Sequence, residues 1–140
     1  MATGSGPSGD ASPVLTVEGG RIDDIPTLYE EINRVFMGDE SWALGHSLDA
    51  LDDMLYGGYG ATRGRDGVTI RWVDHAHTAA ALGVEATRRY YDAKIRQPEV
   101  FDGDAARRRR AELLQGTGQT YFEMVREIFE SHRRVVVRWE

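Results

Sequence analysis

The chain of 140 residues has the length of a single domain with room for a hydrophobic core. Its 23 Asp and Glu residues outnumber its 17 Lys and Arg residues, and the formal net charge is −6. This charge argues against nucleic acid or an anionic membrane surface as the direct partner and favours a basic one. The sequence contains no cysteine, which excludes disulfides, thiol catalysis and cysteine-ligated metal sites.

Residues 1–13 are almost entirely Gly, Ala, Ser, Thr and Pro, a composition that buries too little apolar surface to offset the entropy lost on ordering. We predict that they form a disordered leader before one domain at 14–140. The leader has neither a basic segment nor an apolar run, and no later segment approaches the roughly 18 apolar residues of a membrane span. We therefore expect a cytoplasmic protein without a secretion signal.

Apolar periodicity divides the rest of the chain into strands and helices. Short β-branched runs that end at glycines are typical of strands, and apolar residues three and four apart are typical of helices. Asp24 and Ser47 are suitable N-caps, and the pair Gly57-Gly58 is a suitable helix stop. These signals predict strands at 14–17, 68–72 and 135–137 and helices at 25–36, 48–55, 78–82 and 119–131.

Three strands separated by helical segments favour an α/β fold, a small three-stranded parallel sheet with helices packed against it. The run Val135-Val136-Val137 is continuously apolar, the pattern of a strand that is buried on both faces. Residues 84–116 are charged and irregular in pattern. We predict that they form an insertion before the last helix, in which 107–114 is a short helix.

The predicted helix at 48–55 carries three carboxylates, Asp49, Asp52 and Asp53, on about one and a half turns. Residues three and four apart share a helix surface, so these like charges repel by roughly 0.2–0.5 kcal/mol per pair. Such a cluster does not stabilise the fold. No Lys or Arg lies between Arg34 and Arg63 to neutralise it. The natural complement of this acidic surface is a cationic partner.

The pattern Gly45-x-Ser47-Leu48-Asp49-Ala50-Leu51-x-Asp53-x-Leu55, preceded by a strand, a glycine turn and a helix, resembles the barstar family of intracellular ribonuclease inhibitors. The similarity continues into Ile70-Arg71-Trp72, and it can be followed through residues 14–82 and again through 119–139. The resemblance implies a small α/β fold and a protein that is not an enzyme. It further implies that the acidic helix and the loop before it plug the active site of a basic ribonuclease.

The resemblance also implies roles for individual residues. Asp49 and Asp53 match two aspartates that meet the Arg and Lys side chains with which the ribonuclease holds RNA phosphates. Gly45 matches the glycine of the binding loop, and Glu127 matches an acidic contact on the final helix.

Four positions depart from the family pattern. Ser47 replaces an asparagine, and Asp52 stands where the family often has tryptophan. Ala43 and Leu44 stand where the best-known member of the family has a tyrosine pair, so we expect a different cognate partner. Trp42, Tyr56 and Tyr59 are the candidates for the missing aromatic contact. The partner-binding residues that we predict are Trp42, Gly45, His46, Ser47, Asp49, Asp52, Asp53, Tyr56 and Glu127.

Other chemistries fit these residues less well. The helical aspartates could hold Mg²⁺ or Ca²⁺, but they lack the backbone oxygens of a calcium loop. His75 and His77 could be two ligands of a metal, yet no third ligand has suitable spacing. The segment 57–60 follows a helix instead of opening one, which favours a helix stop over a phosphate loop. The arginine run 107–110 fits a solvated helix face better than a contact with RNA or an acidic partner.

Three functions therefore compete. The first is an inhibitor of a basic ribonuclease, with no cofactor, no metal and no direct contact to nucleic acid or membrane. The second is a barstar-like immunity or regulatory protein that binds a different toxin or basic protein. The third is a hydrolase that uses paired aspartates as acid and base, and it is weak because the chain offers no evident nucleophile, cofactor loop or metal cluster. We expect the first.

Overall fold

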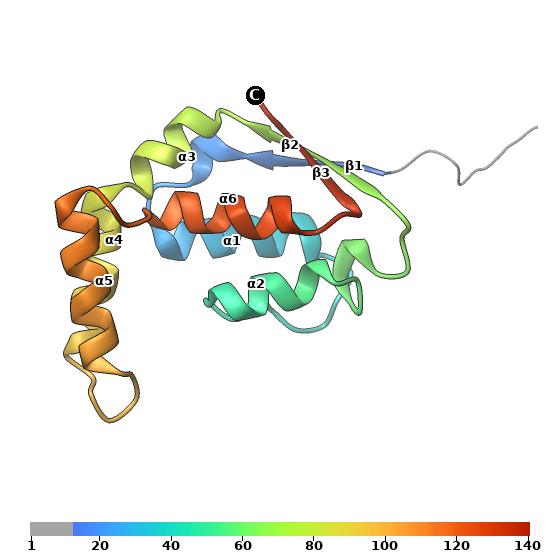
Figure 1. The fold of residues 1–140 in the computed structure, drawn as a ribbon. Helices are drawn as coiled ribbons and strands as arrows, with labels where there is room; N and C mark the ends of the chain where they lie inside the picture. The colour runs from blue at the N-terminus through green and yellow to red at the C-terminus, as the bar shows by residue number, and fades with distance from the viewer. Residues whose placement is uncertain (1–12) are drawn as a thin grey trace, which may run out of the picture.

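A computed structural model describes residues 13–140, so the predicted leader at 1–13 lies almost wholly outside the described residues. No helix between residues 13 and 140 has the length and apolar character that crossing a membrane requires. In chain order the elements are β1 (Val14–Glu18), η1 (Gly19–Arg21), α1 (Ile25–Phe36), α2 (Leu48–Leu55), η2 (Gly60–Thr62), β2 (Val68–Val73), α3 (His75–Ala81), α4 (Val84–Ile95), α5 (Gly103–Gln115), α6 (Tyr121–Ser131) and β3 (Val135–Trp139) (Figure 1).

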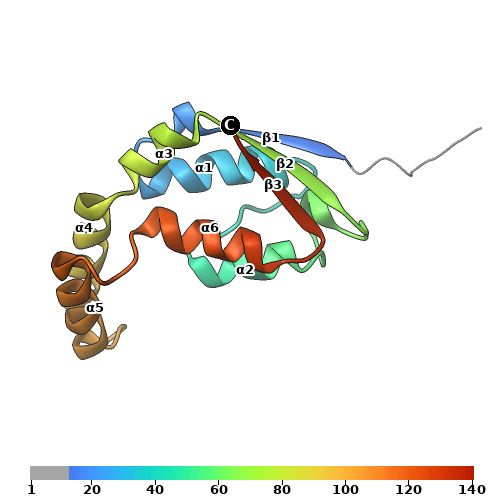
Figure 2. The ribbon, with the colours of Figure 1, turned by 45° about the horizontal axis from the view of Figure 1, so that its top comes forward.

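The three strands form one parallel sheet in the order β1-β2-β3, which confirms the predicted fold class. The register places Ile70 of β2 between Leu15 of β1 and Val137 of β3. Ile70 and Trp72 are fully buried, because α1 and α6 cover this face of the sheet (Figure 2). Helix α2 lies next to α6 and farther from the sheet, so its outer side faces away from the core.

β3 lies at an edge of the sheet, and the prediction that its valines are buried on both faces is wrong. Val135 is buried, but Val136 is 57% exposed and points away from the helices. The reason is that α1, α2 and α6 all lie on the same side of the sheet, as both views show. A continuous apolar run indicates a strand, but it does not determine how many of its faces are covered.

Local capping explains where the helices near the site begin. Asp24 accepts a hydrogen bond from the Thr27 N–H at 2.8 Å and starts α1. The Ser47 hydroxyl accepts one from the Ala50 N–H at 3.0 Å and starts α2. Gly57, which follows the end of α2, has a φ of +91°, a conformation that favours glycine. These three helix ends confirm the sequence prediction.

Residues 84–116 fold into a hairpin of α4 and α5 that projects from the rest of the molecule (Figures 1 and 2). Tyr91, Ala106 and Leu113 form a small core inside it. At its base, the Phe122 N–H donates to the Leu82 carbonyl at 3.1 Å. The hairpin thus leaves and rejoins the body at neighbouring points. The sequence predicted the α5 segment in part, as a short helix, but it did not predict α4.

Candidate protein-interaction site

The acidic face of α2 points outward because the opposite face is anchored in the core. Leu51, Met54 and Leu55 are essentially inaccessible to solvent. Helical geometry then leaves Asp49 and Asp53 exposed. Within residues 13–140, neither carboxylate takes part in a hydrogen bond or an ion pair. Two negative charges are therefore presented on a rigid element without internal neutralisation.

Asp52 behaves differently from its two neighbours. Its Oδ1 lies 2.7 Å from Nε2 of His132, the residue that follows α6. The His132 side chain is only 7% exposed, whereas that of Asp52 is 39% exposed. The Tyr56 ring meets the His132 ring edge-on at 4.6 Å. One oxygen of Asp52 thus joins α2 to the end of α6, and the rest of the carboxylate remains open to solvent.

The loop at 42–47 is fixed by contacts with α1. The Asn33 side chain accepts a hydrogen bond from the Leu44 N–H at 2.6 Å and donates one to the Leu44 carbonyl at 3.3 Å. The His46 ring stacks on the Tyr29 ring, with centroids 5.0 Å apart and planes 12° apart. Leu44 is buried, and the residues on both sides of it are exposed. The loop is therefore ordered around one buried anchor.

Gly45 lies on this loop and is not required by the fold. A Cβ atom placed there would meet no atom within 4 Å, and its φ is not in the left-handed region. Neither turn geometry nor close packing thus explains the glycine. Its lack of a side chain leaves the loop backbone open to close approach by another molecule.

Two exposed aromatic side chains flank the acidic face. Trp42 is 47% exposed and Tyr56 is 66% exposed. The Trp42 ring packs on the Tyr59 ring at 4.8 Å. Burial, together with the nearby charge of Asp53, raises the pKa of Tyr59. Tyr59 therefore contacts the Trp42 ring and is influenced by the charge of Asp53.

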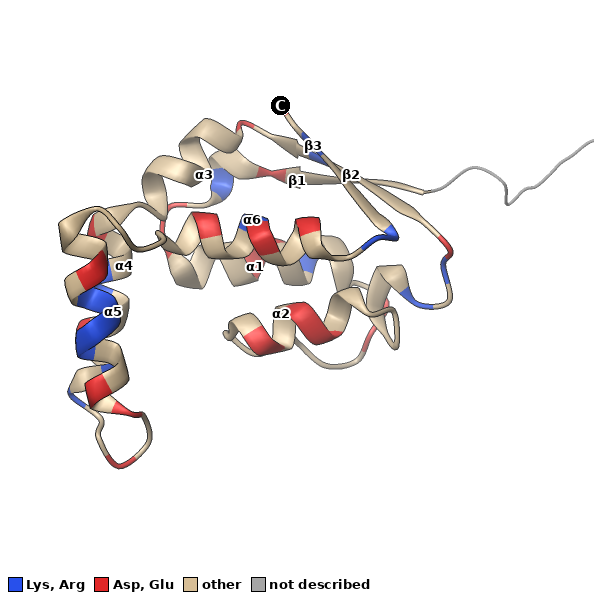
Figure 3. Cartoon of the chain, in the orientation of Figure 1, with Lys and Arg blue, Asp and Glu red and all other residues tan. Residues whose placement is uncertain are grey.

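Glu127 lies on the exposed side of α6, the helix next to α2. Figure 3 shows acidic residues along both helices on the side turned to the viewer. Within residues 13–140, Glu127 has no ion pair, whereas its neighbours Arg126 and Glu130 pair with each other at 3.2 Å. The carboxylates of α2 and α6 thus belong to adjacent surfaces.

Sequence reasoning missed three residues that shape this site. Asn33 is distant from the loop in sequence, His132 pairs with Asp52 across 80 positions, and Arg134 donates to the carbonyls of Tyr56 and Arg65. Arg134 thereby caps the C-terminal end of α2. None of these contacts leaves a periodic signal in the sequence.

The two histidines considered as metal ligands have protein partners. His75 Nδ1 lies 3.0 Å from the Glu140 carbonyl, and His77 Nε2 lies 2.9 Å from Asp23 Oδ1. Residues 13–140 contain no group of three or more His, Cys, Asp or Glu side chains placed to hold a metal ion.

The fold and its surface define a small parallel α/β protein that presents an acidic helix and an ordered loop. The family model for Barstar (barnase inhibitor) matches residues 12–94, more than half of the chain. The chain therefore belongs to the barstar family, whose members are inhibitors rather than enzymes. The matched segment includes every predicted partner-binding residue except Glu127. Neither a search of curated proteins nor one of solved structures found a match.

Proposed function

We propose that the protein binds a basic ribonuclease in the cytoplasm and blocks its RNA-binding active site without catalysing a reaction itself. The contact surface consists of the loop at 42–47, the outward face of α2 and Glu127. The observation that carries the proposal is the pair Asp49 and Asp53, exposed and unneutralised within residues 13–140. A ribonuclease must bind a polyanion, so its cleft holds cations that complement such carboxylates.

The neighbouring features support tight binding. Trp42 and Tyr56 are the types of side chain that most often dominate the energy of protein interfaces. The Asn33 contacts hold the loop in place before any partner arrives. Preordering reduces the entropy lost on binding.

A second candidate is an immunity or regulatory protein that binds a different toxin or basic protein. The observation in its favour is the position of Leu44, which is 3% exposed and cannot contact a partner where the best-known family member has a tyrosine. Aromatic contacts from Trp42 and Tyr56 would give the surface a different shape. A changed target is therefore compatible with an unchanged acidic helix.

The test compares two isosteric substitutions. Asp53→Asn removes the proposed anchor. The control, Asp74→Asn, removes one charge directly before α3, and α1 and α6 separate α3 from α2 (Figure 1). Asn is suited to the left-handed conformation of Asp74, whose φ is 55°. Inhibition of RNA cleavage is measured against a panel of purified basic ribonucleases that includes barnase, with thermal unfolding of each variant as the folding control.

We expect near one-to-one inhibition of one ribonuclease of the panel. Loss of one partner of a desolvated charge pair costs about 2–5 kcal/mol, so Asp53→Asn should bind that enzyme correspondingly more weakly, mostly through faster dissociation. Its thermal midpoint should match that of Asp74→Asn. Equal inhibition by the two variants would refute the acidic helix as the contact surface, and RNA cleavage by the protein itself would refute the inhibitor reading.

A further inference from the structure

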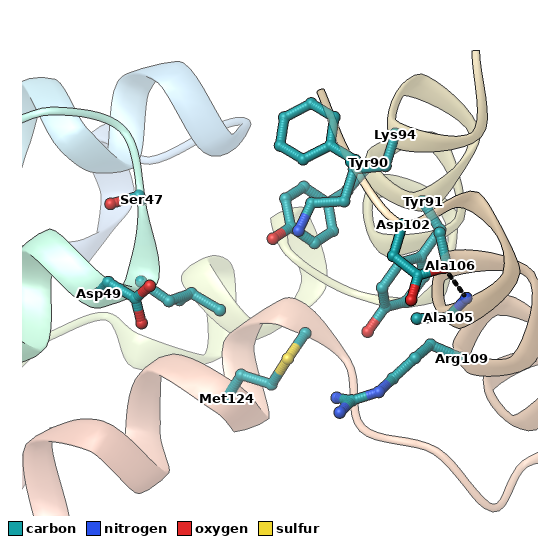
Figure 4. A pocket seen from close by; sticks show the side chains of 12 residues that line it. Ser47, Asp49, Tyr90, Tyr91, Lys94, Asp102, Ala105, Ala106, Arg109 and Met124 are labelled. Carbon is teal, nitrogen blue, oxygen red and sulfur yellow. Dashed lines mark hydrogen bonds between the residues drawn. The ribbon is translucent and has the colours of Figure 1, made fainter. Parts of the chain in front are cut away.

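A cleft of about 510 Å³ separates the start of α2 from the α4–α5 hairpin. In Figure 4, Ser47 and Asp49 lie on one wall, Lys94 and Arg109 on the hairpin wall, and Met124 of α6 between them. The cleft adjoins the acidic face of α2, because Asp49 belongs to both. Any molecule seated on α2 therefore lies beside the hairpin.

The carboxylates of the hairpin do not neutralise the two cations on its cleft wall. Lys94 and Arg109 form no ion pair with a carboxylate in the described part of the chain. Other hairpin arginines do: Arg88 pairs with Glu85 and Asp92, Arg107 with Asp104, and Arg110 with Asp92. Lys94 and Arg109 are therefore available to a ligand. The carboxylate on the same wall, Asp102, accepts hydrogen bonds from the Asp104 and Ala105 N–H groups at the start of α5.

The cleft combines this positive charge with apolar surface. Lys94 Nζ lies 4.6 Å from the centroid of the Tyr90 ring and 5.2 Å from that of Phe101, so two aromatic faces partly desolvate it. Met124 and Leu48 add aliphatic surface to the lining. A carboxylate next to an apolar side chain fits such a lining.

Charge disfavours a nucleic acid as the occupant. The chain has a net charge of −6, and Asp49 faces the cleft from the opposite wall. A polyanion would be repelled by both. A protein segment avoids this repulsion, because it can place one carboxylate against the hairpin and a neutral or basic group against Asp49.

We propose that the cleft is a second contact site for the ribonuclease and receives a surface loop in which an Asp or Glu is next to an apolar residue. The proposal rests on the proposed function, since α2 must first seat the ribonuclease. Every ribonuclease needs a cationic active site to bind RNA, but the surface beside that site can differ from one ribonuclease to another. The hairpin therefore discriminates between ribonucleases that α2 alone would bind with similar affinity.

The test asks whether removing a positive charge from the cleft weakens or strengthens binding to the ribonuclease. Lys94→Gln and Arg109→Gln each remove a cation from the cleft, and Arg108→Gln removes one from the adjacent position of α5 outside it. The partner is basic, so long-range electrostatics alone makes any lost cation neutral or favourable for binding. The assay measures inhibition of the ribonuclease that the wild-type protein inhibits most tightly in the panel.

We expect Lys94→Gln and Arg109→Gln to weaken inhibition by about tenfold, equivalent to about 1.4 kcal/mol, and Arg108→Gln to leave it unchanged or tighter. Unchanged inhibition by all three variants, with normal thermal midpoints, refutes this inference and leaves the proposed function intact. Failure of the wild-type protein to inhibit any ribonuclease of the panel refutes the proposed function, and this inference with it.

Nuclear magnetic resonance tests the chemistry of the cleft directly. We expect N-acetyl-Glu-Phe-amide to shift the Met124 methyl and Arg109 Nε–H signals at millimolar concentrations, and N-acetyl-Gln-Phe-amide to shift them less. Equal shifts from the two peptides would refute recognition of a carboxylate. Binding of a short single-stranded RNA at the same signals would assign the cleft to phosphates and also overturn the inference.

Discussion

Asn33 provides a direct test of whether order in the loop matters for binding. Replacing it by Ala removes the acceptor for the Leu44 N–H and the donors to the carbonyls of Leu44 and Tyr29. Leu44 is 3% exposed, so its backbone groups lose partners in a place that water reaches poorly. An unsatisfied buried polar group costs about 1–3 kcal/mol. Because Asn33 is only partly buried, we expect Asn33→Ala to lower the free energy of unfolding by about 2 kcal/mol.

The same change should weaken inhibition by about 1 kcal/mol, since a loosened loop loses freedom on binding. Urea unfolding gives the stability, and hydrogen exchange of the amides at 43–47 reports the order of the loop. Glu30→Ala, at an exposed position of the same helix, controls for helix propensity. If Asn33→Ala matches Glu30→Ala in stability and in amide exchange, Asn33 does not hold the loop.

Two further predictions concern the buried polar groups of α1. Tyr29→Phe leaves the buried Tyr121 hydroxyl without its partner at 2.6 Å and should lower the free energy of unfolding in urea by about 1–3 kcal/mol. Adding Tyr121→Phe removes the unpaired hydroxyl and should restore much of that free energy. If the losses of the two single variants simply add in the double variant, the two hydroxyls are not coupled. Burial raises the pKa of Tyr29 to about 12 from 10.0, so stability should be lost as the pH rises between these values, and less so in Tyr29→Phe. Burial also acts to raise the pKa of Glu31, but hydrogen bonds from Arg34 and the Glu18 N–H and the charge of Arg34 outweigh it, and the pKa lies below 4.5. This stabilisation is present above pH 4.5 and is lost as the pH falls through the folded-state pKa, so the thermal midpoint of Glu31→Gln should fall less on acidification than that of the wild type.

Local signals in the sequence were sufficient for the core elements. Ser47 and Gly57 define the ends of α2 through a cap and a left-handed turn that depend only on nearby residues. Helix α4 was missed because its buried side is formed by Thr87 and Tyr91 instead of aliphatic residues. Its apolar partners come from α5 and α6, and the sequence of α4 alone does not reveal them.

The same division applies to the site. The exposure of Asp49 and Asp53 follows from helical periodicity, because Leu51 and Leu55 must face the core. The pairing of Asp52 with His132 joins residues 80 positions apart and depends on how α2 and α6 pack. Whether a side chain of the acidic cluster is free or engaged is thus a tertiary property, although the cluster itself is visible in the sequence.

The hydrogen bond from the Phe122 N–H to the Leu82 carbonyl closes the base of the hairpin. When the ends of a segment are already in contact, a change in its length costs little free energy, because each doubling of loop length adds only about 0.6 kcal/mol of closure entropy. The base of the hairpin is fixed to α6, because the Tyr121 N–H donates to the buried Thr87 hydroxyl at 2.7 Å and the Tyr90 ring packs on the Tyr121 ring. The part of the hairpin beyond Tyr90 can therefore lengthen, shorten or change in sequence while the sheet and α2 stay as they are. Such an arrangement lets the surroundings of the acidic helix diversify at a rate that the packed core does not limit.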